Sequence, residues 1–280
     1  MVIGSKIVSD VAAASFIPHS DESPLLREWL MFSSQFYAEL SKIHHDTGVE
    51  IRKGREFVDE ARRQKRPWYA DCVFNMTPCI PQTDSTQPGA QDEVVYLPPD
   101  KKAGWSFETF LIEPRFFIPW LRRQLEELHV TFKKELVKDL RSLHEYDVVV
   151  NCTGLGSKEL AKDSGMAPIV GQILLLQHSG LDQWVRDSSI KGSIGYVYPQ
   201  RNTVVVGGTK SNEPNKDAEA LKAQLKTKGA TLQPLISHAP EIGLNSGQRP
   251  GRDGFRVEID KLSLEEHTNG LLNAPLIIHN

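Results

Sequence analysis

The run Asp147-Val148-Val149-Val150-Asn151 is the feature that most constrains how this chain can fold. Its apolar, β-branched residues are typical of a strand that is buried on both faces of a parallel sheet. The turn that follows, Cys152 to Glu159, carries Gly154 and Gly156 ahead of a predicted helix. In that context backbone amides can meet a phosphate or a ring. Glu159 stands where the full GxGxxG pattern has its third glycine, so a tight strand-to-helix turn fits at least as well as a nucleotide contact.

Hydrophobic periodicity predicts the remaining elements. Helices are expected over 24–45, 115–129 and 218–228, the last ending before Gly229. Strands are expected over 130–137, 147–151, 171–176, 196–199, 203–206, 254–259 and 276–279. The charged stretch 52–66 is interpreted as a solvated helix or loop face, and 77–89 as a surface loop. This order predicts an α/β (mixed α+β) protein with a partly parallel sheet and a second, mixed sheet.

Composition excludes several classes of protein. A chain of 280 residues is long enough for two domains, and its formal net charge of −3 argues against binding to nucleic acid or an anionic membrane. Lys6 and Asp10 interrupt the opening segment where a secretion signal needs an apolar run. The 3 cysteines have no metal-ligand spacing, so we expect neither a disulfide framework nor a metal site.

Two further features are open to more than one interpretation. Arg249-Pro250, followed by Arg252, precedes a predicted strand and could clamp a carboxylate. Surface arginines beside a turn are the more common explanation of that pattern alone. Tyr196 alternates like an ordinary strand aromatic, which favours a core position over a ligand contact.

The motifs together resemble the D-amino-acid oxidase family of flavoproteins, and within it the D-aspartate oxidase branch. Matching segments occur in the family's order along nearly the whole chain: 9–13 with 17–19, 104–105, 120–121, 147–157, 171–173, 196–199, 206–209, 249–250 and 278–280. The resemblance implies an FAD-binding Rossmann-like domain formed by 1–20, 118–166 and 255–280. It also implies a substrate domain on a mixed sheet, formed by 21–117 and 167–254.

The resemblance further implies an activity and a set of site residues. Family enzymes transfer a hydride from a D-amino acid to FAD, release a 2-oxo acid and ammonia, and reoxidise the flavin with oxygen to give hydrogen peroxide. Arg249 would pair with the substrate α-carboxylate, Tyr196 would donate a hydrogen bond to it, and residues 187–195 would form a lid. Basic residues of the aspartate branch correspond to Arg186 and Lys210, which predicts acidic D-amino acids as substrates. The positions expected to line FAD are Ser9, Asp10, Ala14, Ser15, Val137, Thr153 and Gly154.

The chain also departs from the family pattern. Val2-Ile3-Gly4 runs into Ser5 without the GxGxxG unit, the printed sequence stops at Asn280 before the family's glycine-rich stretch, and Ala14 replaces a glycine. The alternative is therefore a truncated, non-catalytic family member that binds no FAD and acts through a protein partner. An NAD-dependent dehydrogenase fits poorly because its fingerprint is incomplete. The resemblance implies a peroxisomal location, although Ile278-His279-Asn280 is no targeting tripeptide, and the cytoplasm is the other expectation.

Overall fold

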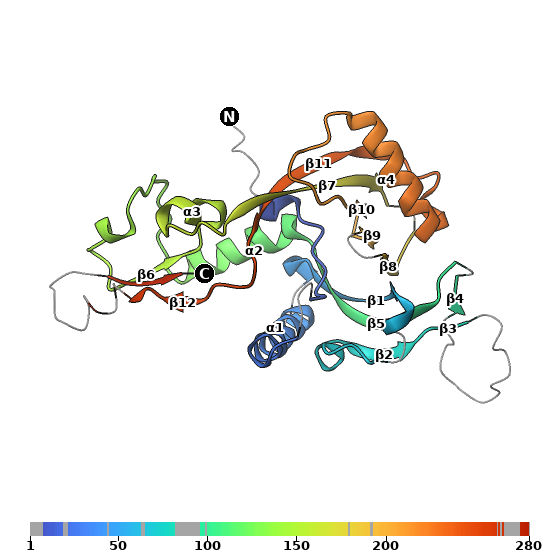
Figure 1. The fold of residues 1–280 in the computed structure, drawn as a ribbon, viewed down its shortest axis with the longest axis horizontal. Helices are drawn as coiled ribbons and strands as arrows, with labels where there is room; N and C mark the ends of the chain where they lie inside the picture. The colour runs from blue at the N-terminus through green and yellow to red at the C-terminus, as the bar shows by residue number, and fades with distance from the viewer. Residues whose placement is uncertain are drawn as a thin grey trace. The chain divides into compact units, whose positions relative to one another are not determined.

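The computed structural model describes residues 8–18, 22–43, 45–62, 65–81, 96–98, 100–178, 180–190, 193–261, 263, 265 and 275–279. The chain forms two compact units (Figure 1). Unit 1 comprises Met1–His129, Gly171–Lys210 and Pro214–Gly247, and unit 2 comprises Val130–Val170, Ser211–Glu213 and Gln248–Asn280. Each unit is described separately below.

An 8-stranded mixed sheet, in the order β11-β7-β10-β9-β8-β1-β5-β2, forms most of unit 1. Its strands are β1 Val49–Val58, β2 Phe74–Pro78, β5 Ala103–Ile112, β7 Ala167–Gln177, β8 Trp184–Ile190, β9 Ser193–Pro199, β10 Thr203–Gly207 and β11 Glu241–Gly251. β1 pairs with β8 in parallel and with β5 antiparallel. β7 and β11 each continue in sequence into unit 2. A small pair, β3 Ile80–Pro81 and β4 Tyr96–Leu97, is parallel.

Helix α4, Ala218–Leu232, covers one face of this sheet (Figure 1). Asp217 caps its N-terminus by accepting a hydrogen bond from the Ala220 amide, and Leu221 and Leu225 enter the core. The helix continues through Gly229, so the prediction that it ends before this residue is wrong. A Cβ atom at Gly229 would overlap Val206 of β10, which shows that glycine lets helix and strand approach closely.

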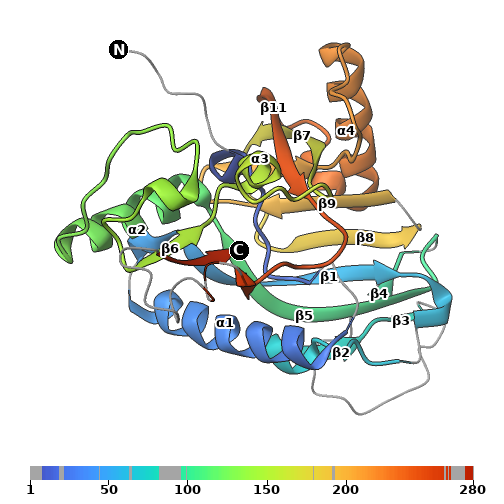
Figure 2. The same cartoon turned by 60° about the vertical axis from the view of Figure 1, so that its left-hand side comes forward.

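The opposite face of the sheet carries an aromatic core that includes Trp105, Phe107, Trp184 and Tyr198. At the end of β5, helix α1 Pro24–Ile43 and helix α2 Pro114–Glu127 contribute to a separate cluster around Phe110 (Figure 2). α1 begins with Pro24 after Ser23, whose hydroxyl accepts a hydrogen bond from the Leu26 amide. Both helices thus start with proline. Tyr37 and Leu40 of α1 and Phe117 and Trp120 of α2 pack in the cluster, whereas Phe32 of α1 is 73% exposed.

Unit 2 contains a 3-stranded sheet in the order β12-β13-β6. β6 Val148–Asn151 and β13 Leu276–His279 are parallel, and β12 Glu258–Ile259 pairs antiparallel with β13. Leu140, Val149 and Ile277 are buried on one face, against Val137. A short turn leads from β6 into helix α3, Ser157–Leu160. The carboxyl ends of two parallel strands therefore meet beside this turn.

The mixed α/β fold class is confirmed, as are the helices near 24–45 and 115–129 and the strands near 147–151, 171–176, 196–199, 203–206 and 276–279. Several other predictions are wrong. Residues 130–137 form no strand, only Glu258–Ile259 of 254–259 are paired, and 49–58 form the long strand β1 instead of a solvated face. Thr77 and Pro78 end β2, and residues 82–95 lie outside the described part of the chain.

The compact units and the expected functional domains have different limits. Residues 8–18 and the helical part of 118–129 belong to unit 1, whereas the resemblance assigns 1–20 and 118–166 to an FAD domain. The division into FAD and substrate domains therefore stays a prediction. Within the described residues, no helix is both long and apolar enough to cross a lipid bilayer.

Candidate active site

A row of side chains crosses five strands of the unit 1 sheet. The strand registers align Trp105 of β5 with Glu56 of β1, Glu56 with Arg186 of β8, Arg186 with Tyr196 of β9, and Tyr196 with Gly207 of β10. Directly opposed residues project from the same face of a sheet. Two of the residues expected to bind substrate, Arg186 and Tyr196, are therefore neighbours on the aromatic face.

Tyr196 is held by ring packing. Its ring stacks on Tyr198 with a centroid separation of 4.5 Å and an interplanar angle of 13°. Gly207 also lies against the Tyr196 ring, and a Cβ atom at position 207 would overlap that ring. The Ser15 hydroxyl donates to the Tyr198 hydroxyl over 3.0 Å, and burial raises the pKa of Tyr198. Ser15, an expected FAD residue, is thus connected to the aromatic pair through Tyr198.

Arg186 is buried in an ion pair with Glu56. Its Nε lies 3.4 Å from Glu56 Oε1, and the two residues are only 4% and 3% exposed. The Tyr69 hydroxyl donates to Glu56 Oε2 over 2.6 Å, and the Ser188 hydroxyl donates to Oε1 over 2.7 Å. Burial, followed by the Glu56 carboxylate, raises the pKa of Tyr69. Arg186 is therefore paired with Glu56, and its expected role at the substrate side chain stays a prediction.

Sequence reasoning missed Glu56. Charged residues dominate the stretch from Arg52, and neither helical nor strand periodicity marks the one carboxylate that is buried. The pairing of β1 with β8, which are far apart in the sequence, brings Glu56 to Arg186. No local signal in the sequence could have identified that contact.

The other predicted residues of unit 1 lie around the ends of the sheet. Ser9 and Asp10 are exposed in a short 3-10 helix, Val8–Val11. Ala14 has a positive φ of 41°, and its carbonyl accepts a hydrogen bond from the Ile112 amide. Lys210 is exposed beyond β10. Residues 187–190 and 193–195 of the expected lid lie in the paired strands β8 and β9, so their role as a lid stays a prediction.

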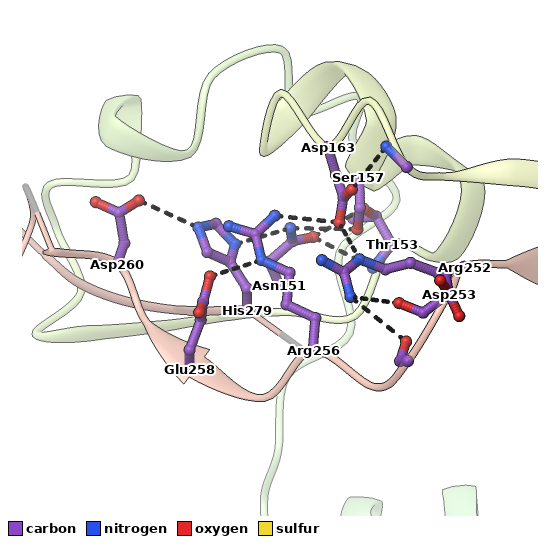
Figure 3. Close-up of polar contacts among 12 residues, drawn as sticks. Asn151, Thr153, Ser157, Asp163, Arg252, Asp253, Arg256, Glu258, Asp260 and His279 are labelled. Carbon is purple, nitrogen blue, oxygen red and sulfur yellow. Dashed lines mark hydrogen bonds and ion pairs between the residues drawn. The ribbon is translucent and has the colours of Figure 1, made fainter. Parts of the chain in front are cut away.

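In unit 2, the turn after β6 is held by a chain of polar contacts (Figure 3). The Thr153 hydroxyl donates to Asn151 Oδ1 over 2.7 Å, and Asn151 Nδ2 lies 3.3 Å from His279 Nδ1. With Asn151 as the donor, His279 Nδ1 accepts, and Nε2 carries the proton toward Asp260 Oδ2 at 3.3 Å. Burial alone would raise the pKa of Asp260, but hydrogen bonds from Ser263 and His279 lower it.

Gly154 lies close to Pro250, the residue that follows Arg249, in this unit. Gly154 follows Thr153 with a φ of 57°, and a Cβ atom there would lie 3.7 Å from Pro250 Cγ. Arg249 precedes Pro250 and is exposed on β11. The predicted FAD turn therefore lies beside the segment that carries the predicted carboxylate clamp. Val137 is half-buried against the unit 2 core.

Arg252 does not share the position of Arg249. Its Nε lies 3.0 Å from Asp163 Oδ2, which is also 3.2 Å from Arg256 Nη1 (Figure 3). The two guanidinium groups lower the pKa of Asp163, although burial opposes the effect. Arg252 is therefore committed to a structural ion pair, and Arg249 remains the candidate clamp. The described residues include no cluster of three or more possible metal ligands.

The comparisons with known proteins agree with this fold. The family model described as "FAD dependent oxidoreductase" (DAO) matches residues 8–274. Human D-aspartate oxidase is 29% identical over 264 residues, which cover 91% of this chain and 73% of the relative. A D-amino-acid oxidase of Rubrobacter xylanophilus is 30% identical over 222 residues, covering 77% of this chain and 63% of the relative. The chain thus spans part of the length of each.

Solved structures show the same fold at low identity. Glycine oxidase from Geobacillus kaustophilus matches with a TM-score of 0.65 and 14% identity, covering 97% of this chain and 78% of that one. Iminodiacetate oxidase from Chelativorans sp. BNC1 matches with a TM-score of 0.66 and 14% identity, covering 98% and 80%. The family match extends over nearly the whole chain and so includes both compact units. The chain belongs to the FAD-dependent oxidoreductase family.

Proposed function

We propose that the chain is an FAD-dependent oxidase of D-amino acids, with oxygen as the second substrate. The match of the family model to residues 8–274 carries the proposal, since the cofactor of this family is FAD. The names of the human and Rubrobacter relatives support D-amino acids as the substrate class. Tyr196, which is partly buried on the aromatic face of the unit 1 sheet, carries a hydroxyl that can donate to a small carboxylate substrate.

The turn after β6 fits an FAD-binding role. It lies at the carboxyl ends of the parallel strands β6 and β13, where ligands of α/β sheets bind. The Asn151 side chain engages both the hydroxyl and the amide of Thr153 and so orders the backbone ahead of Gly154. Thr153, Gly154 and Val137 are the residues of unit 2 proposed to hold the cofactor.

Bound FAD would supply the electron acceptor for the α-carbon hydride, so the chain's own residues need only bind and orient the substrate. Arg249 would form a bidentate pair with the α-carboxylate, because a planar guanidinium matches carboxylate geometry. Tyr196 would donate its hydroxyl proton in a hydrogen bond to a substrate carboxylate. Its stack on Tyr198 restricts the ring and so lowers the entropy lost on binding.

Flavin retention is the first test. Purified protein is incubated with excess FAD, desalted and examined by visible absorption. A retained flavin band that bleaches anaerobically with a D-amino acid, but not with its L enantiomer, supports the proposal. Protein without flavin would contradict it and favour the alternative, a non-catalytic family member that acts through a partner.

Substrate preference needs its own assay. We propose acidic D-amino acids, by analogy with the relative named D-aspartate oxidase and because the exposed residue Lys210 is basic. Turnover of D-aspartate, D-glutamate and D-alanine is compared at equal concentrations. Faster oxidation of D-alanine than of both acidic substrates would contradict this preference while leaving the oxidase proposal intact.

A further inference from the structure

The buried carboxylate of Glu56 lies beside the candidate substrate site, and the proposed function does not account for it. Glu56 is 3% exposed, and its strand β1 lies between β5 and β8 in the sheet. Burying a carboxylate is costly unless it is paired and hydrogen-bonded. Glu56 meets both conditions through Arg186, Tyr69 and Ser188. Such a group is held in position by its partners.

Glu56 faces Arg186, which in turn faces Tyr196. Register pairing places the three residues in line across β1, β8 and β9. Glu56 and Arg186 carry opposite charges at 3.4 Å between Oε1 and Nε, so the field of the guanidinium at its other neighbours is largely cancelled. Because both side chains are about 5% exposed or less, solvent does little to screen either charge. The carboxylate therefore sets how positive the surface beside Tyr196 is.

From these contacts we infer that Glu56 is a specificity-determining residue, which neutralises Arg186 and weakens selection for a second carboxylate on the substrate. The inference rests on the proposed function, because it concerns the side-chain end of the same site. Glu56 acts through Arg186 and needs no contact with the substrate. With Glu56 present, D-amino acids with uncharged side chains meet no strong excess of positive charge there. Without Glu56, the second carboxylate of a dicarboxylic substrate would be attracted by the uncancelled charge of the buried Arg186.

The decisive experiment uses Glu56→Gln in the full chain. The variant keeps the size of the side chain and a hydrogen-bond acceptor but removes the charge. We expect the ratio of kcat/KM for D-aspartate to that for D-alanine to rise about tenfold over the original protein, because an uncancelled, poorly screened charge acts on the second carboxylate. A ratio within twofold of the original, in a variant that remains folded, would overturn the inference.

Three variants separate charge from packing. Tyr69→Phe removes the 2.6 Å hydrogen bond to Glu56 but leaves its charge, so the ratio stays unchanged. Glu56→Asp keeps the charge and also keeps the ratio. The double variant Glu56→Gln with Arg186→Gln removes both charges and loses the gain seen with Glu56→Gln alone. A gain in Tyr69→Phe equal to that in Glu56→Gln would show that loosened packing, not charge, is the cause.

A binding measurement distinguishes failure of this inference from failure of the proposed function. Malonate, a dicarboxylate, and acetate, a monocarboxylate, are added to each variant, and the thermal unfolding midpoint is recorded. Malonate should stabilise Glu56→Gln more than the original chain, while acetate should affect both equally. If no variant oxidises any D-amino acid, the oxidase proposal fails, and the malonate shift alone then supports or overturns the role of Glu56.

Discussion

At single residues, this chain differs from the sequence pattern of its family, and the backbone conformation shows what the difference costs. Ala14 has a φ of 41°, in the left-handed region that favours glycine, and its carbonyl is tied to the Ile112 amide. The resemblance expects a glycine at this position. The conformation is therefore retained although the residue suited to it is absent, and the alanine carries the strain.

Ala14→Gly should stabilise the protein. Relief of the left-handed conformation gains about 1–2 kcal/mol, of which about 0.4–1 kcal/mol is offset by the greater freedom of glycine in the unfolded chain. We expect the free energy of unfolding to rise by about 0.5–1 kcal/mol in urea titrations. A decrease would show that the alanine methyl group makes contacts that outweigh the strain.

Gly207→Ala should displace Tyr196. The added Cβ atom would overlap the tyrosine ring, so the ring must leave its stack on Tyr198. We expect the free energy of unfolding to fall by about 1–3 kcal/mol, as for other overpacked sites. We also expect kcat/KM, measured per folded molecule, to fall. Gly243→Ala is the matched control, because a Cβ atom at Gly243 meets nothing within 4 Å. Equal effects of the two substitutions would contradict the role assigned to Gly207.

Between elements, one partly buried ion pair connects β8 to the segment before β5. Lys101 Nζ lies 2.8 Å from Asp187 Oδ2, and the side chains are 13% and 12% exposed. Burial opposes ionisation of both groups, but Lys101 and Ser189 lower the pKa of Asp187, and Asp187 and Asp100 raise the pKa of Lys101. The pair therefore stabilises the native state at pH values above the folded pKa of Asp187 and below that of Lys101, where both groups are charged.

The pH dependence of stability follows from these shifts. Asp187 contributes stability above its unfolded pKa of 3.8, and this contribution is lost as the pH falls through the lower folded value. Asp187→Asn should cost about 1.5–3 kcal/mol at pH 7. The cost should be smaller at pH 3, because below the unfolded pKa of 3.8 the unfolded chain binds a proton at Asp187 and the advantage of the ionised native pair declines. Urea midpoints at the two pH values provide the measurement. A penalty of equal size at pH 3 would contradict this assignment.

Hydrophobic patterning along the sequence predicted the helices and strands whose apolar residues recur at a regular spacing or in a continuous run. Apolar spacing identified α1 and α2, and β-branched runs identified β6 and β10. The strand β1 escaped prediction because its charged residues hide a strand that is paired on both sides. α4 was cut short at Gly229 because glycine usually weakens a helix, whereas here it permits contact with Val206. In both cases a neighbour in space overrode the local preference.

For the molecule as a whole, a small net charge and exposed apolar side chains both favour self-association. The formal net charge of −3 gives little mutual repulsion near pH 7. Val148 and Val150 on one face of β6 are 50% and 55% exposed, while Val149 on the other face is 8% exposed. Exposed apolar patches of this kind promote association. We expect self-association to begin at this strand.

The double substitution Val148→Thr with Val150→Thr should slow aggregation near pH 7, measured by light scattering. It should change stability by less than about 0.5 kcal/mol, because both side chains are exposed. Val149→Thr is the control on the same strand and should cost about 1–3 kcal/mol, since it buries a hydroxyl. Equal destabilisation by the double substitution and by Val149→Thr would show that both faces of β6 are covered in solution.

The sequence alone determined the family, the fold class and the order of the main elements, because these depend on periodicities and motifs that are local or short. It also indicated Tyr196, Arg249 and the turn at Thr153 and Gly154 as candidates, through the family resemblance. Their roles stay predictions, to be decided by flavin retention and substrate turnover.

The charge state of the candidate site was decided only by tertiary structure. Strand pairing neutralises Arg186 with Glu56, and the fold of unit 2 commits Arg252 to Asp163 while leaving Arg249 exposed. The free energy of a buried charge depends on its partners and on the water that they exclude, and those partners come from distant parts of the chain. A residue's type is written in the sequence, but whether its charge can reach a ligand depends on the neighbours that the fold provides.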